Sequence, residues 1–179
     1  ARCCERLLSL KYNVIMASRS EENRNIVLQG TEFRYFDLND RMSIRNACNN
    51  VDVIVHAAGM NAYQCSRSLE NAILVNGSGT EILAEEAIKA GVRKVIFLST
   101  EHVYRSPLIG LIDERTEPTN KHPYAFSNLA GEKHLIDLAQ KSDLEAVVLR
   151  ISNCVGKPLF FDTNWLHLVV NDFCLQALE

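Results

Sequence analysis

The chain lacks a long apolar run. A helix that crosses a bilayer needs about 18 consecutive apolar residues, and no stretch of that kind occurs among the 179 residues. The first residues, ARCCERLLSLKYN, also lack the apolar segment and the cleavage site of a secretory signal. We therefore expect no membrane association, and we predict a cytoplasmic protein.

A dominant charge sign is also missing. The sequence has 19 lysines and arginines against 22 aspartates and glutamates, a formal net charge of −3, and the two signs are interspersed. Proteins that bind nucleic acid usually carry a basic patch or a run of lysine and arginine. We therefore predict no nucleic-acid partner, and a small molecule or another protein in its place.

Paired cysteines are absent as well. None of the six cysteines forms a CxxC pair, the spacing that many zinc sites and thioredoxin-like redox centres use. We therefore predict no metal site, and reduced cysteines that pack in the core. The six are Cys3, Cys4, Cys48, Cys65, Cys154 and Cys174.

What the chain does contain is a regular alternation of short β-branched runs and helical segments. This rhythm is typical of a parallel sheet with crossover helices, so we predict an α/β fold with a doubly wound parallel sheet. The predicted strands are 13–17, 32–36, 51–58, 94–99 and 145–152. The predicted helices are 2–10, 40–49, 68–90, 122–141 and 164–178.

Six sequence motifs follow one another in a recognisable order. They are DLND at 37–40, VIVHAAG at 53–59, VNGSGT at 75–80, FLSTEHVY at 97–104, YAFSNLAGE at 124–132 and LRISNCVGKP at 149–158. In these motifs the chain resembles the extended short-chain dehydrogenase/reductase family, in the branch of NAD(P)-dependent nucleotide-sugar epimerases and dehydratases. The resemblance covers essentially the whole chain. It implies an NAD(P)-binding Rossmann domain over 1–156 and the start of a substrate-binding part at 157–179.

The resemblance also implies a strand and a glycine-rich turn, GxxGxxG, before the first helix. Aligned on the family's spacings, the last glycine of that turn would stand immediately before Ala1. In the sheet order 3-2-1-4-5-6 the absent first strand would lie between 13–17 and 51–58. We therefore expect the natural protein to have an upstream segment and a longer substrate-binding part.

The end of the second family strand implies which dinucleotide is bound. A carboxylate there accepts from a ribose hydroxyl of NAD, whereas a cation suits the 2′-phosphate of NADP. Ser18 stands at this position and Arg19 follows, which favours NADP over NAD. The alternative is that Arg19 is only a solvated residue at a strand end.

Asp37 and Leu38 match the family's adenine contact. In this interpretation the carboxylate accepts the adenine amino group and the leucine covers the ring. The alternative is that Asp37 caps the helix that begins near residue 40.

The small residues Ala57, Ala58 and Gly59 would let the backbone approach the cofactor closely. Asn76, in the VNGSGT motif, is a further cofactor contact implied by the resemblance. His56 is expected to be packed or hydrogen-bonded rather than catalytic.

The reaction centre of the family combines a serine or threonine, a tyrosine, and a lysine four residues after the tyrosine. Thr100 matches the first and Tyr124 the second. The resemblance implies that Thr100 holds the substrate oxygen and that Tyr124 exchanges the proton while hydride moves to or from the nicotinamide. The alternatives are a plain strand-end hydroxyl and a plain helix-start aromatic residue.

Asn128 occupies the lysine position. Residues four apart share a helix face, so Asn128 is predicted to lie beside Tyr124 as a catalytic and cofactor-binding residue. An amide can bond a ribose hydroxyl but carries no charge, and a nearby cation is what lowers the pKa of a phenol from about 10. We therefore expect Tyr124 to stay largely protonated and proton abstraction to be slow.

Other side chains could compensate for the missing cation. Lys121 and His122 precede the predicted helix, and Glu101 and His102 follow a predicted strand end, where they are candidate acids or bases and candidate substrate contacts. Asn153 is a further substrate contact implied by the resemblance. Such residues are more often surface charges than catalysts.

Three functions remain open from the sequence. The first is an oxidoreductase of the epimerase or dehydratase type that acts on a nucleotide sugar. The second is a catalytically weakened NAD(P)-binding sensor or scaffold, and the third is a reductase of a non-sugar carbonyl. A homodimer through the helices at 68–90 and 122–141 is also possible, because paired helices in such domains often form a four-helix interface.

Overall fold

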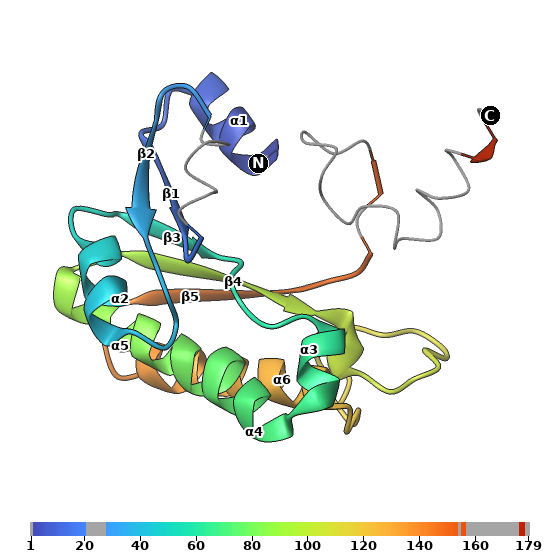
Figure 1. The fold of residues 1–179 in the computed structure, drawn as a ribbon. Helices are drawn as coiled ribbons and strands as arrows, with labels where there is room; N and C mark the ends of the chain where they lie inside the picture. Colours follow the sequence, from blue (N-terminus) through green and yellow to red (C-terminus); the bar gives the residue numbers. More distant parts are fainter. Residues whose placement is uncertain (1, 21–27, 154, 157–175, 178–179) are drawn as a thin grey trace. The chain divides into compact units, whose positions relative to one another are not determined.

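The computed structural model describes residues 2–20, 28–153, 155–156 and 176–177 (Figure 1). The predicted helix at 164–178 therefore falls almost wholly outside the described residues. The chain divides into two compact units, one of residues 1–34 with 152–179 and one of residues 35–151. The predicted boundary at residue 156 stays a prediction.

In the described part of the first unit there are the helix α1 and a two-stranded sheet. α1 covers Arg2–Ser9 and has no buried residue, and β1 at Val14–Ser18 pairs with β2 at Thr31–Tyr35. Cys3 is exposed on α1, whereas Cys48 and Cys65 of the second unit are buried. The prediction that the cysteines pack in the core is therefore wrong for Cys3.

The second unit contains a three-stranded parallel sheet in the order β3-β4-β5. Its strands are β3 at Val53–His56, β4 at Lys94–Thr100 and β5 at Glu145–Ile151. Its helices are α2 at Arg41–Cys48, α3 at Ala62–Arg67, α4 at Leu69–Ala72, a π-helical segment η2 at Ile73–Ser78, α5 at Gly79–Ala90, a 3₁₀ turn η3 at Glu101–Val103 and α6 at Pro123–Ala139.

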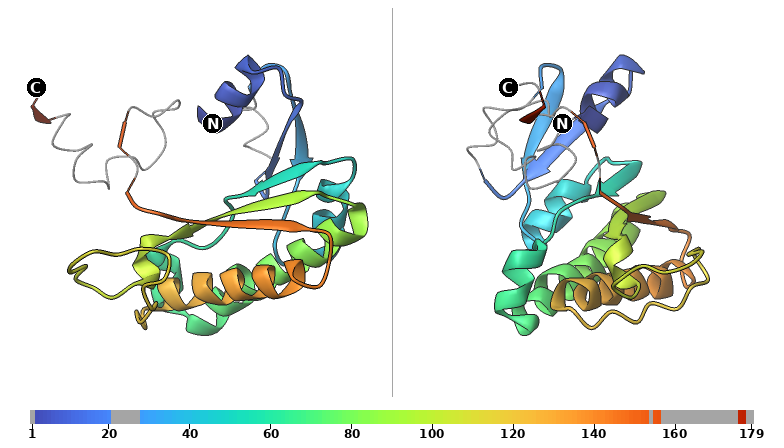
Figure 2. Two further views of the ribbon diagram at one scale, coloured as in Figure 1. Left: turned by 180° about the vertical axis from the view of Figure 1, so that it is seen from behind. Right: turned by 90° about the vertical axis from the view of Figure 1, so that its right-hand side faces the viewer.

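Two long helices cover one face of this sheet. α5 and α6 lie side by side against it in all three views (Figures 1 and 2). On β4, the buried Val95 and Phe97 alternate with the half-buried Ile96 and Leu98, as the two-residue period of a strand requires. The fold is thus the predicted α/β arrangement with parallel strands.

The described strands form two separate hydrogen-bonded ladders. Among the described residues, one sheet contains β1 and β2 and the other contains β3, β4 and β5.

The segment predicted as one helix at 68–90 is not uniform. It begins as α4, widens into the π-helical η2, and continues as α5 until Gly91 ends it in the left-handed conformation at φ 75. α6 packs closely on the widened turn: a Cβ added at Gly131 would lie 2.5 Å from the carbonyl oxygen of Asn76. The π turn therefore needs a glycine opposite it.

No helix within the described ranges is both long enough and apolar enough to cross a membrane.

Candidate functional site

Tyr124 stands in the first turn of α6, near the carboxyl end of β4. Pro123 opens the helix, a favourable residue at its first position. The Nδ1 atom of His122 accepts the backbone N–H of Tyr124 at 3.2 Å, so the imidazole acts as the helix cap. The cap and the proline together determine where α6 begins, and Tyr124 is the second residue of that helix.

Thr100 and Tyr124 are brought together as predicted. Thr100 is buried at the end of β4, and its Oγ1 accepts the backbone N–H of His102 at 3.2 Å. Burial raises the pKa of the Tyr124 phenol, and a side-chain hydrogen bond from Thr100 lowers it only in part. The phenol therefore stays protonated at neutral pH.

Asn128 shares the helix face of Tyr124, but its amide is turned to the backbone. Its Nδ2 donates to the carbonyl oxygen of Tyr124 at 2.8 Å, and the side chain is buried. Ser127 donates to the same carbonyl at 3.1 Å. The amide is thus engaged inside the helix, at the place where the family's ammonium would stand.

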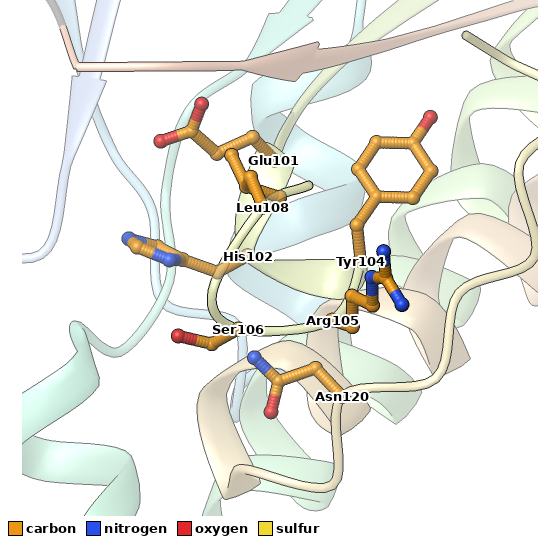
Figure 3. Close-up of a pocket in the computed structure, with 7 residues that line it drawn as sticks. All are labelled: Glu101, His102, Tyr104, Arg105, Ser106, Leu108 and Asn120. Atoms are coloured by element: carbon orange, nitrogen blue, oxygen red, sulfur yellow. The ribbon is translucent and has the colours of Figure 1, made fainter. Parts of the chain in front are cut away.

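A cavity of about 200 Å³ lies at the 3₁₀ turn and loop that follow β4 (Figure 3), and Thr100, Tyr124 and Asn128 are not among its lining residues. The lining residues are Glu101, His102, Tyr104, Arg105, Ser106, Leu108 and Asn120. The ring of His102 meets that of Tyr124 edge to face, with the centroids 6.2 Å apart. The predicted candidates Glu101 and His102 therefore line this cavity, and the ring of His102 also contacts the ring of Tyr124.

Both the oxygen and the nitrogen of the Asn76 side-chain amide form hydrogen bonds within the protein. Its Oδ1 accepts the N–H of Met60 at 2.7 Å, and its Nδ2 donates to the Met60 carbonyl at 3.2 Å and to Ser127 Oγ at 3.1 Å. A Cβ at Gly59 would lie 2.9 Å from Asn76 Oδ1. Asn76 and Gly59 thus hold the loop after β3 in place, and the predicted cofactor contact of Asn76 stays a prediction.

His56 is a packed residue, as expected. It stacks on Phe97 with ring centroids 5.1 Å apart, and its Nε2 lies 3.0 Å from Thr80 Oγ1. Thr80 gives its hydroxyl proton to the Asn76 carbonyl at 2.6 Å, so Nε2 of His56 is the donor to Thr80. Burial lowers the pKa of His56 to about 4, which keeps the ring neutral.

The two adenine candidates differ in exposure. Asp37 is half-buried and its carboxylate accepts the N–H of Asn39 at 2.9 Å. The alternative that Asp37 caps the next helix is wrong, because Asp40 is the cap of α2. Leu38 is buried in the core against Gly79, so its contact with an adenine ring stays a prediction.

Three further candidates lie outside the unit that holds Tyr124. Ser18 and Arg19, at the end of β1, and Asn153, after β5, belong to the first unit. Arg19 and Asn153 are exposed. Ala57 and Ala58, by contrast, lie in the second unit and are exposed after β3.

One functional arrangement was not predicted. Glu132 accepts from Ser99 and, through two nitrogens, from Arg150, which also donates to the hydroxyl of Tyr104 at 3.0 Å. Tyr104 in turn donates to the Asp113 carbonyl at 2.9 Å. The network anchors the loop that walls the cavity to α6 and to the sheet. The charges of Glu132 and Arg150 were visible in the sequence, but not their pairing across 18 residues.

The family model of the NAD dependent epimerase/dehydratase family matches residues 1–176. The chain belongs to this family. The predicted resemblance and fold class are thereby confirmed.

Several relatives of the family are similar in sequence or structure. A UDP-glucose 4-epimerase of Vibrio cholerae is 30% identical over 150 residues, which cover 80% of this chain and 45% of that protein. A dTDP-D-glucose 4,6-dehydratase of Mus musculus is 32% identical over 108 residues, 59% of this chain and 30% of that protein. The UDP-glucose 4-epimerase of Thermus thermophilus, solved as a complex with NAD, has a TM-score of 0.72 and 28% identity over 82% of this chain and 49% of that chain. The chain thus spans half the length of these relatives or less.

Proposed function

We propose that the protein is an NAD(P)-dependent enzyme of the epimerase or dehydratase type that acts on a nucleotide sugar through transient hydride transfer. The observation that carries this proposal is the side-chain hydrogen bond between Tyr124 and Thr100 at the carboxyl end of β4, where the 3₁₀ turn that follows lines a cavity. Ligands of parallel α/β sheets bind at this edge. The relatives named above, two UDP-glucose 4-epimerases and a dTDP-D-glucose 4,6-dehydratase, support the substrate class.

The residues present fit a dinucleotide. Ala57, Ala58 and Gly59 expose backbone with little side chain after β3, as a close approach of a cofactor requires. We assign Asp37 and Ser18 with Arg19 to the adenosine end, and Arg19 favours NADP over NAD. When bound, the dinucleotide would supply the hydride acceptor and donor. Tyr124 and Thr100 would hold the substrate oxygen by hydrogen bonds.

The test uses the full-length protein. We expect a dinucleotide to co-purify and at least one UDP- or dTDP-sugar to be turned over. Tyr124→Phe should reduce kcat by about 100-fold or more, because it removes the hydroxyl at the reacting oxygen. A Tyr124→Phe variant with the turnover of the wild type would refute the assignment of Tyr124.

A second function is favoured by the geometry at Asn128. Because its amide is bonded to a backbone carbonyl and Tyr124 stays protonated, a weakened NAD(P)-binding sensor or scaffold is the competing proposal. Asn128→Lys decides between the two. Activity that appears only in this variant would support the sensor or scaffold, whereas activity in the wild type supports the enzyme. Turnover of a simple carbonyl compound instead would indicate the third proposal, a non-sugar reductase.

We also propose a homodimer through the helices at 68–90 and 122–141. Four apolar side chains on these segments are exposed, namely Leu69, Leu74, Phe126 and Ile136. Light scattering on the full-length protein should give the mass of a dimer, and Leu74→Lys should shift it toward the monomer. A monomeric wild type would refute the proposal.

A further inference from the structure

The proposed oxidation requires a group that takes the proton of a sugar hydroxyl, and Tyr124 is badly suited to this role. Burial raises the pKa of its phenol. The amide of Asn128 is bonded to the Tyr124 carbonyl and brings no charge. Tyr124 is therefore a hydrogen-bond donor at neutral pH, so the base has to be another residue.

Three further titratable side chains lie around Tyr124. Cys65 on α3 is fully buried, and burial raises the pKa of its thiol. His122 uses Nδ1 to accept the backbone N–H of Tyr124, so its ring caps α6. The third is His102 on η3, whose ring contacts the phenol edge to face.

His102 has the properties that a proton acceptor needs. The side chain is exposed and lines the cavity, with its imidazole directed away from Tyr104 (Figure 3). Within the described part of the chain, no hydrogen bond occupies its ring nitrogens. A neutral imidazole is the side chain most often used as a base near neutral pH.

The other charged and titratable groups of the cavity are Glu101, Arg105 and Tyr104. Arg105 donates to the Ile109 carbonyl at 3.2 Å, and Tyr104 is hydrogen-bonded to Asp113. Glu101 is a carboxylate, which is a weaker base than an imidazole. His102 is thus the strongest free base in the cavity.

We propose that His102 is the catalytic base of this site, and that Tyr124 and Thr100 act as hydrogen-bond donors to the same substrate oxygen. The inference rests on the proposed function. In the step, the O–H bond of the sugar hydroxyl breaks and a new N–H bond forms on the imidazole. The oxygen would keep the electron pair and become a carbonyl oxygen, and the nicotinamide dinucleotide, when bound, would supply the acceptor for the hydride that leaves the carbon. In the return step the imidazolium gives the proton back.

The test combines rates with direct titration of the imidazole. In the full-length protein, His102→Gln should lower kcat at neutral pH by about 100-fold, with little change in KM, and should abolish the loss of rate toward acid pH. The imidazole of His102, followed by NMR, should titrate at the midpoint of that loss in kcat/KM. His134→Gln is the matched control. His134 lies on α6, 3.4 Å from Glu81 of α5, and is not among the residues that line the cavity, so its variant should keep the wild-type profile.

The outcomes separate the two proposals. Turnover in the wild type with an unchanged profile in His102→Gln would overturn this inference alone, as would a midpoint that does not match the titration of His102. Loss of the acid limb in Glu101→Gln but not in His102→Gln would assign the base to Glu101. A wild type without any hydride transfer to or from a nucleotide sugar would overturn the proposed function and this inference with it.

Discussion

Glu132 is buried, and its carboxylate oxygens accept hydrogen bonds from neighbouring side chains. Its carboxylate accepts from Ser99 and from two nitrogens of Arg150, and this pairing raises the pKa of the Arg150 guanidinium. The guanidinium also lies 5.0 Å above the ring of Tyr104. A buried ion pair adds little to stability as a whole, but removal of one partner leaves an uncompensated charge.

Glu132→Gln should therefore lower the free energy of unfolding by about 2–4 kcal/mol, because Arg150 keeps its charge and loses its partner. Urea denaturation measures the change. The control is Glu145→Gln, which removes an exposed ion pair to Lys94 of 2.7 Å and should have a much smaller effect, because solvent screens the two charges. Equal losses in the two variants would contradict the role given to Glu132.

At the scale of the elements, α6 is fixed against the widened turn of η2. Gly131 faces the Asn76 carbonyl so closely that a methyl group does not fit, whereas a Cβ at Gly77 would lie 3.3 Å from the Cβ of Ala130. The two glycines therefore offer a graded test of the same interface.

Gly131→Ala should destabilise the protein by about 2 kcal/mol or more, because the backbone carbonyl cannot move away as a side chain would. Gly77→Ala should cost clearly less, since its contact is longer and alanine favours a helix. Thermal unfolding checks both. A Gly131→Ala variant as stable as Gly77→Ala would mean that α6 shifts freely on η2.

The elements also show what the sequence can and cannot predict. Strands and most helices were predicted within a few residues, because alternation and caps are local signals. The shared face of Tyr124 and Asn128 was predicted from their spacing. The direction of the Asn128 amide was not, because it depends on which acceptor its rotamer reaches. The π turn at η2 was missed. It packs against Gly131, which is distant in the sequence, and local sequence signals do not contain such a contact.

For the molecule as a whole, two buried titratable groups contribute to the loss of stability in acid. The folded state lowers the pKa of His56 to about 4 by burial, and it lowers the pKa of Glu86 to about 2, mainly through Arg45 and Lys89. In both cases the unfolded chain binds the proton more readily than the folded protein. Stability therefore falls as the pH falls, between about 6.5 and 4 for His56 and from about 4.5 downward for Glu86.

Unfolding free energy measured against pH should drop by about 3 kcal/mol between pH 6.5 and about 4 through His56. His56→Gln should flatten this part of the curve, because glutamine does not titrate. A slope that survives in His56→Gln would show that other groups cause the loss.

Below about pH 4.5 the second group, the Glu86 carboxylate, accounts for the further loss of stability. Glu86 has a fully buried side chain that holds Arg41, Arg45 and Lys89 at 2.8–2.9 Å. Glu86→Gln should lower the free energy of unfolding by about 1–3 kcal/mol at pH 7. The difference in unfolding free energy between the variant and the wild type should become smaller as the pH approaches 2. Denaturant midpoints at several pH values measure this convergence, and a gap independent of pH would contradict it.

The packing of α6 against η2 and the sheet also has a consequence for protein engineering. Gly131 and Glu132 fix the helix to η2 and to the strands about two turns beyond Tyr124, and neither residue carries chemistry. Reactivity and placement are thus encoded at separate positions of one helix. In a randomised library of α6 we expect folded members to tolerate changes at Asn128 and few at Gly131 or Glu132, so new proton-transfer groups can be introduced without rebuilding the scaffold.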